Sequence, residues 1–250
     1  MLKALFLDMD ETLCDTSKAN DIAKRELAKR AQAMCGSSLH SEQFVERYVQ
    51  GIYRQWTPVQ QQRYMPMIEQ HSEDEFRVQL IQDLLDDMQQ PAIKVEDALL
   101  LQNCFDKERL AAFDFFPGIE LFLRDMRKRM TLVVITNGPV FSQVPKVQRV
   151  NLAQHVDHII IGGQEKQQKP ARSIFTKALR LAACENHEVI HIGDGLTPDI
   201  GGANASHIKS VWVRNNQCFD KNLGITPDYI VEYPDALPEL IEQLCQSFQK

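Results

Sequence analysis

Six short apolar runs are the feature of the sequence that most constrains how this chain can fold. Each run is continuous, without the alternation of apolar and polar residues that a half-exposed strand shows. Continuous runs are typical of strands that helices cover on both faces, as in parallel sheets. The runs lie at residues 4–7, 132–135, 159–161, 189–192, 211–213 and 229–231. From residue 118 onward, segments of helical periodicity, such as residues 119–126 and 174–183, lie between these runs. This alternation predicts an α/β fold with a doubly wound, Rossmann-like parallel sheet.

The stretch between the first run and the others has a different pattern. It has no convincing strand, and apolar residues recur in it every four residues, which predicts helices. One stripe, which predicts a helix over residues 41–56, consists of Phe44, Tyr48, Ile52 and Trp56; the other consists of Phe76, Leu80, Leu84 and Met88. Ser72 and Glu75 precede the second stripe at capping-box spacing. We read the stripes as core, and Phe116-Pro117-Gly118 as the return to the sheet.

The sequence therefore predicts two domains. The α/β core is expected to comprise residues 1–15 and 114–250, and a helical domain residues 16–113. A chain of 250 residues is long enough for a core with a smaller second domain.

Composition excludes several kinds of partner and site. The net charge of −6, with acidic and basic residues mixed along the chain, argues against a nucleic-acid polymer or a membrane surface as partner. The six cysteines include no C-x-x-C pair, which argues against a zinc site or a disulfide framework. No apolar run approaches the roughly 20 residues of a membrane helix, and the first run is too short for a signal peptide. We expect a cytoplasmic protein.

Polar residues follow the predicted strands where an active site of an open α/β sheet would lie, outside their carboxyl ends. These residues are Asp8 and Asp10 after the first strand, Thr136 and Asn137 after the second, and Asp194 after the fourth, with Lys169 at the start of a helix and Asp199 shortly after Asp194. Each has a structural alternative. Asp8 and Asp10 could form an acidic turn, Lys169 could be a solvated surface lysine, and Asp199 could cap a helix.

The motifs in this order, D-x-D-x-T, T-N, K-P and G-D-x-x-x-x-D, resemble those of the haloacid dehalogenase superfamily. The resemblance covers residues 1–16 and 116–250, and the helical insertion lies where that superfamily places its cap domain. It implies a phosphomonoester hydrolase in which Asp8 attacks phosphorus and forms an aspartyl-phosphate. Asp10 would protonate the leaving oxygen and then take a proton from the hydrolytic water.

The resemblance also implies a Mg²⁺ ion, bound by the side chains of Asp8 and Asp194 and the backbone carbonyl of Asp10. Thr136 and Asn137 would donate hydrogen bonds to the phosphoryl oxygens. Lys169 would add a positive charge, and Asp199 would act through metal-bound water or Lys169. This combination suits the chemistry, because enzymes accelerate phosphomonoester hydrolysis by up to about 10²¹-fold and no single group can supply that.

The acid at Asp10 argues against dehalogenation, because halide departs without a proton. Residues 161–175 and the motifs around Thr136 and Asp199 resemble those of the N-acylneuraminate phosphatases, and pyrimidine 5′-nucleotidases share much of the pattern. The sequence departs from it at Gly195, where Ser, Thr or Asn is usual, and at Pro139 and Pro145. We expect hydrolysis of a small phosphorylated metabolite, such as N-acylneuraminate phosphate. The alternatives are a pyrimidine 5′-nucleotidase and a catalytically silent binding module.

Two arginines of the helical domain are further candidates. Arg47 and Arg54 are seven residues apart, so on one helix over residues 41–56 they would lie on the same face. Either that face is solvated, or one arginine contacts a second anionic group of the substrate. The sequence does not indicate an oligomeric state.

Overall fold

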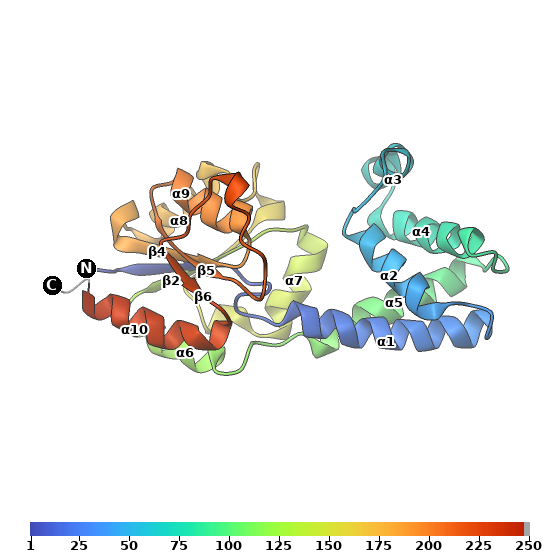
Figure 1. Cartoon of the computed structure of the whole chain (residues 1–250), viewed down its shortest axis with the longest axis horizontal. Helices are drawn as coiled ribbons and strands as arrows, with labels where there is room; N and C mark the ends of the chain where they lie inside the picture. Colours follow the sequence, from blue (N-terminus) through green and yellow to red (C-terminus); the bar gives the residue numbers. More distant parts are fainter. Residues whose placement is uncertain (248–250) are drawn as a thin grey trace. The chain divides into compact units, whose positions relative to one another are not determined.

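The computed structural model describes residues 1–247, and the chain divides into two compact units (Figure 1). The first unit consists of residues 1–17 and the chain from Phe113 onward, and the second is Lys18–Ala112. The divisions lie close to the boundaries expected from the sequence, residues 15/16 and 113/114.

A six-stranded, all-parallel sheet forms the centre of the first unit. Its strand order is β3-β2-β1-β4-β5-β6, which is a doubly wound order and confirms the predicted fold class. The strands are β1 (Ala4–Leu7), β2 (Thr131–Thr136), β3 (His158–Ile161), β4 (Val189–Gly193), β5 (Lys209–Val213) and β6 (Tyr229–Val231). The order reverses between β1 and β4, and every residue of these two strands is buried. Ligands of such sheets bind in the crevice at this reversal.

Helices cover both faces of the sheet, which is why its strands are mainly apolar (Figure 1). In the figure, α6 (Ile119–Arg127) and α10 (Leu237–Ser247) lie below the sheet, and α8 (Arg172–Ala182) and α9 (Gly202–Ala205) above it. Phe6 of β1 and Phe175 of α8 belong to one buried cluster with Val133 and Ile135 of β2. Gly118 precedes α6 with φ of 84°, a left-handed conformation that glycine adopts without strain.

The remaining elements of the first unit are short or lie at the edges. They are α7 (Val140–Arg149), the 3-10 turns η1 (Leu152–Gln154), η2 (Gly162–Gln164), η3 (Asn186–Glu188), η5 (Lys221–Leu223) and η6 (Pro234–Ala236), and the π-helix η4 (Leu196–Gly201). The segments after β1, β2, β3 and β4 carry the candidate site.

The second unit, whose residues are all described, contains helices and no strand. Its helices are α1 (Thr16–Cys35), which begins in the first unit, α2 (Ser41–Ile52), α3 (Pro58–Gln70), α4 (Glu73–Asp87) and α5 (Val95–Ala112). Both apolar stripes contribute to one core, in which Phe44, Tyr48, Phe76, Leu80 and Leu84 are buried. Ser72 caps α4, with its hydroxyl accepting a hydrogen bond from the Glu75 N–H at 3.1 Å.

The predicted helix over residues 41–56 is wrong at its end, because α2 stops at Ile52. Trp56 reaches the core from the following turn, where its indole N–H donates to the carbonyl of Gly51 at 2.7 Å. Arg54 lies in that turn with φ of 58°, so it does not share a helix face with Arg47. Each arginine has a partner within its own unit. Arg47 pairs with Asp87 and Arg54 with Glu73.

Among residues 1–247, no helix is long and apolar enough to cross a membrane.

Candidate active site

The reversal of strand order brings two of the predicted aspartates together. The Asp8 N–H donates to the carbonyl of Ile192 in β4 at 2.9 Å, so Asp8 continues the pairing of β1 with β4. Asp194 follows β4 directly. Because β1 and β4 are parallel neighbours, both acids leave the sheet at the same edge, where a doubly wound sheet binds its ligand.

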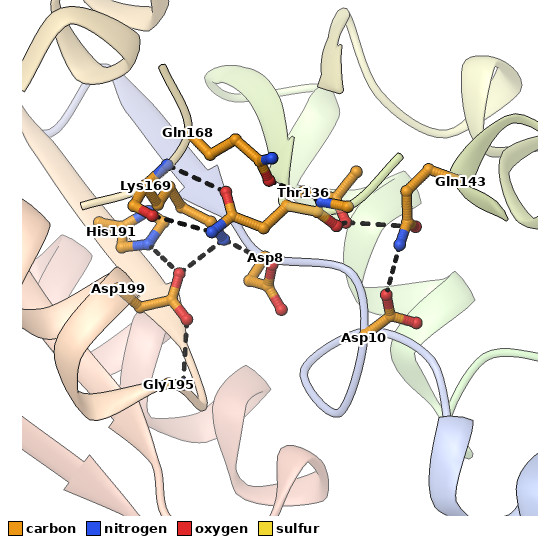
Figure 2. Close-up of polar contacts among 11 residues, drawn as sticks. Asp8, Asp10, Thr136, Gln143, Gln168, Lys169, His191, Gly195 and Asp199 are labelled. Atoms are coloured by element: carbon orange, nitrogen blue, oxygen red, sulfur yellow. Dashed lines mark hydrogen bonds and ion pairs between the residues drawn. The ribbon is translucent and has the colours of Figure 1, made fainter. Parts of the chain in front are cut away.

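Lys169 lies between two carboxylates at this edge (Figure 2). Its Nζ donates to Asp8 Oδ1 at 2.5 Å and to Asp199 Oδ1 at 2.7 Å, and the residue is only 5% exposed. The alternative of a solvated surface lysine is therefore excluded. Asn137 fixes the backbone of Lys169, because its side-chain amide donates to the Lys169 carbonyl at 2.9 Å and accepts from the Lys169 N–H at 3.0 Å.

Asp8, Asp194 and Asp199 form the candidate metal centre. One carboxylate oxygen from each lies within 4.8 Å of the others. Burial raises the pKa of Asp8, and the Lys169 ammonium lowers it. The effect of burial is larger, so the pKa of Asp8 is raised to about 7. Burial and the charge of Asp8 also raise the pKa of Asp194. These three carboxylates thus face one ammonium group, that of Lys169. Their oxygens form a set of hard donors suited to a divalent cation such as Mg²⁺.

Asp199 differs from the other two carboxylates. Its burial alone would raise its pKa, but the Lys169 ammonium and the hydrogen bond from His191 outweigh that effect and lower the pKa to about 2. One oxygen also accepts a hydrogen bond from the Gly195 N–H at 3.0 Å. Asp199 therefore holds Lys169 in place as a permanently charged partner, and also closes the turn that follows β4.

His191 is a site residue that the sequence did not indicate. It lies in β4, as the apolar run predicts, and its Nε2 is 2.8 Å from Asp199 Oδ1. Burial lowers the pKa of His191, so the ring is neutral and Nε2–H donates to Asp199. A histidine within a strand carries no signal of such a role, because its partner becomes a neighbour only through the turn after β4.

Asp10 does not point toward Lys169, and its carboxylate is turned toward α7 (Figure 2). It accepts hydrogen bonds from Lys146 Nζ at 2.7 Å, Thr16 Oγ1 at 2.6 Å and Gln143 Nε2 at 3.2 Å. Burial would raise the pKa of Asp10, but the Lys146 ammonium and the hydrogen bonds lower it. Gln143 and Lys146 also escaped the sequence reasoning, although their spacing of three residues places them on one face of a helix.

Thr136 lies at the end of β2, beside the same glutamine. Its hydroxyl donates weakly to Gln143 Oε1 at 3.4 Å. The side chain of Asn137 is engaged with the Lys169 backbone, which is a positioning contact that the sequence did not indicate. Both residues lie at the predicted edge of the sheet, and their contact with a phosphoryl group stays a prediction.

The departures from the family pattern have local explanations in two cases. A Cβ atom on Gly195 would lie 2.5 Å from Pro198 Cγ and 2.9 Å from Asp199 Oδ2, so the ring of Pro198 occupies the space of a side chain there. Pro139 precedes α7 with φ of −72° and ψ of 152°, an extended conformation that suits a proline before a helix. Pro145 lies inside α7, and nothing in the structure explains it.

Comparison with known proteins identifies the family. The family model described as a haloacid dehalogenase-like hydrolase matches residues 2–207 of the chain. The chain belongs to this family. The match confirms the resemblance carried by the four motifs and confirms that the protein is a hydrolase.

Curated relatives and solved structures agree with this assignment. Human N-acylneuraminate-9-phosphatase is 24% identical over 97% of this chain and 95% of its own. The glyceraldehyde 3-phosphate phosphatase of Methanopyrus kandleri is 23% identical over 98% of this chain and 100% of its own. The HAD-hydrolase YfnB of Bacillus subtilis, solved bound to magnesium, has a TM-score of 0.68 at 19% identity, covering 96% of this chain and 98% of that one. The family match and these relatives confirm the predicted enzyme class, a phosphatase of the haloacid dehalogenase family.

Proposed function

We propose that this protein hydrolyses a small phosphate monoester through an aspartyl-phosphate on Asp8, with Mg²⁺ as its cofactor. The observation that carries the proposal is the Asp8 carboxylate, which is buried at the strand-order reversal, paired to Lys169 at 2.5 Å and grouped with Asp194. A carboxylate held beside a fixed cation is suited to approach a phosphate dianion, which it would otherwise repel.

In the first step a carboxylate oxygen of Asp8 forms a bond to phosphorus. The bond from phosphorus to the leaving oxygen breaks, its electron pair stays on that oxygen, and Asp10 supplies the proton. Lys169 neutralises charge on Asp8 and the phosphoryl group, and Thr136 and Asn137 donate hydrogen bonds to phosphoryl oxygens. Asp199, His191 and Asn137 keep Lys169 in place.

In the second step a water molecule attacks phosphorus, Asp10 accepts its proton, and Asp8 is released with inorganic phosphate. The side chains of Asp8 and Asp194 and the backbone carbonyl of Asp10 would hold Mg²⁺, with Asp199 beside them. When bound, the ion would offset the negative charges of the carboxylates and the phosphate.

For the substrate we propose a phosphorylated sugar or sugar acid, because curated relatives of nearly full length include N-acylneuraminate-9-phosphatases. Glyceraldehyde 3-phosphate phosphatases are also among the relatives, so small phosphorylated carbohydrates are the common class. We assign the choice of leaving group to the helical unit Lys18–Ala112, as the cap domain of the superfamily. In that unit, Arg47 and Arg54 are each proposed as a contact for a second anionic group of the substrate, but not as a pair on one helix face.

The test of this function is a turnover screen with Mg²⁺ over phosphorylated sugars and sugar acids, triose phosphates and pyrimidine nucleotides. We expect phosphate release from sugar phosphates, with loss of activity after chelation and recovery on adding Mg²⁺. Preference for nucleotides would favour the nucleotidase alternative. No turnover of any compound, including 4-nitrophenyl phosphate, would contradict phosphatase activity.

Mg²⁺ should stabilise the protein more at pH 8 than at pH 5. The pKa of Asp8 is raised from 3.8 to about 7, so the metal-free folded state is favoured below pH 4 and loses stability as the pH rises through 7. Mg²⁺ needs the ionised carboxylates, and saturation near 100 times Kd contributes about 2.7 kcal/mol, or roughly 5–10 °C in Tm.

Thermal unfolding with Mg²⁺ and with chelator, at both pH values, measures this difference. Asp194→Asn should remove most of the Mg²⁺ effect at pH 8. An equal rise in Tm at both pH values, or one that Asp194→Asn leaves intact, would place the metal elsewhere.

A further inference from the structure

The proposed acid, Asp10, has an elaborate set of partners. Both carboxylate oxygens are occupied, Oδ1 by Lys146 and Thr16 and Oδ2 by Gln143. Thr16 lies close in the sequence, whereas Lys146 and Gln143 come from α7, more than 130 residues away. The contact therefore depends on the assembled first unit, which contains all four residues.

Lys146 is buried, whereas lysines are almost always exposed unless they are paired with an acidic group. The residue is 6% exposed, and its Nζ lies 5.3 Å from the centre of the Phe113 ring. Burying an ammonium group is costly unless a carboxylate and hydrogen bonds compensate for the lost water. The carboxylate of Asp10 is the compensating group at 2.7 Å.

Gln143 connects Asp10 to the end of β2. It is 4% exposed, its Nε2–H donates to Asp10, and its Oε1 accepts from the Thr136 hydroxyl. The side chain also packs against Gly138, where an added Cβ would lie 2.7 Å from Nε2. This packing leaves the amide little freedom. One face of α7 thus presents a fixed amide and a fixed ammonium group to the same carboxylate.

We propose that Lys146, with Gln143, is a positioning residue that fixes the carboxyl group of Asp10 for proton transfer to the leaving oxygen. This inference rests on the proposed function and adds to it residues outside the four motifs. Lys146 contacts neither phosphorus nor the leaving group and acts only through Asp10, where its ammonium group stabilises the carboxylate that forms as the proton passes to the leaving oxygen. Its contribution therefore depends on how much the leaving oxygen needs a proton.

Lys146→Met should separate two kinds of substrate. For an alkyl phosphate, whose alkoxide leaving group needs the proton, we expect kcat/KM to fall about 30- to 100-fold, within the range of general acid catalysis. For 4-nitrophenyl phosphate, whose phenolate departs without one, the fall should stay below about threefold. Because kcat/KM reports formation of the phosphoenzyme, a slow second step does not obscure the comparison.

The variant suits this test because the Asp10 side chain remains 26% exposed and water can replace the ammonium group. Lys146→Arg, which retains the charge, should restore part of the loss. Lys177→Met, which removes an outer lysine paired to Glu165, is the matched control and should leave both substrates unchanged. If Lys146→Met does not fold, Gln143→Leu should give the same pattern, with a three- to tenfold loss on the alkyl phosphate.

A double-mutant cycle tests whether Lys146 acts through Asp10. In an Asp10→Asn background, Lys146→Met should change kcat/KM for the alkyl phosphate by less than about twofold. Independent, multiplying losses, or equal losses on both substrates, would overturn the positioning role. The two hypotheses fail in different ways. If the proposed function is wrong, the parent enzyme has no phosphatase activity; if only this inference is wrong, the parent is active and the variants lack the expected pattern.

Discussion

Asp8→Asn is expected to abolish turnover and leave the protein folded. Asparagine has nearly the same shape, but its amide cannot attack phosphorus, so no aspartyl-phosphate can form. Loss of a nucleophile in an enzyme with a covalent intermediate lowers kcat by a factor on the order of 10⁴ or more. Because Asp8 is buried with a raised pKa, a neutral side chain also removes the free-energy cost of a buried charge. The Tm with chelator should therefore not fall by more than a few degrees.

Single-turnover kinetics and mass spectrometry after acid quenching measure this result. The parent enzyme should gain one phosphoryl group on the peptide that contains Asp8, and the variant should gain none. Asp125→Asn is the matched control, because that aspartate lies on α6 in an exposed pair with Lys128. Activity of Asp8→Asn within tenfold of the parent would exclude Asp8 as the nucleophile.

Lys169→Met is expected to have the second largest effect, on both catalysis and stability. The ammonium group is the only cation that contacts both Asp8 and Asp199 among the described residues. Its loss should lower kcat/KM by about 10³-fold for every phosphate monoester, since phosphorylation of Asp8 is impaired whatever the leaving group. Removing one partner of a buried ion pair also costs about 3–5 kcal/mol of stability.

The loss of stability should depend on pH in a known direction. Without Lys169, the folded-state pKa of Asp8 rises further, so Lys169→Met should be more stable at pH 5 than at pH 8. Adding Asp199→Asn should recover part of the lost Tm at pH 8, because it removes one uncompensated carboxylate. Thermal unfolding of the single and double variants measures both effects, with Lys177→Met as the control. A Tm of Lys169→Met that equals that of the parent at pH 8 would contradict the buried pair.

Much of the fold follows from short-range pattern. The continuous apolar runs predicted six strands, and the structure has them, because a strand covered on both faces has no polar side to show. The same pattern located Asp8, Thr136 and Asp194 at strand ends, which parallel strands bring to one edge of a sheet. The apolar stripes of the helical segment predicted helices because residues four apart lie on one face of a helix. The motif order added the family, which the comparisons confirm.

Other features depended on the tertiary structure. Periodicity shows which face of an element is buried but not which element covers it. The order of the strands placed β1 between β2 and β4, and this pairing set Asp8 beside Asp194. The spacing of apolar residues reveals neither the end of α2 at Ile52 nor the hydrogen bond from Trp56 to Gly51.

The polar network of the site shows the same division between sequence and structure. The sequence predicted that Asp8, Asp10 and Lys169 carry the chemistry of the motifs. Only the folded chain decided that His191 supports Asp199 and that Lys146 and Gln143 hold Asp10. Hydrogen bonds and ion pairs of this kind join residues whose sequence separation leaves no periodic signal. Their partners are fixed by the packing of α7 and by the turn after β4.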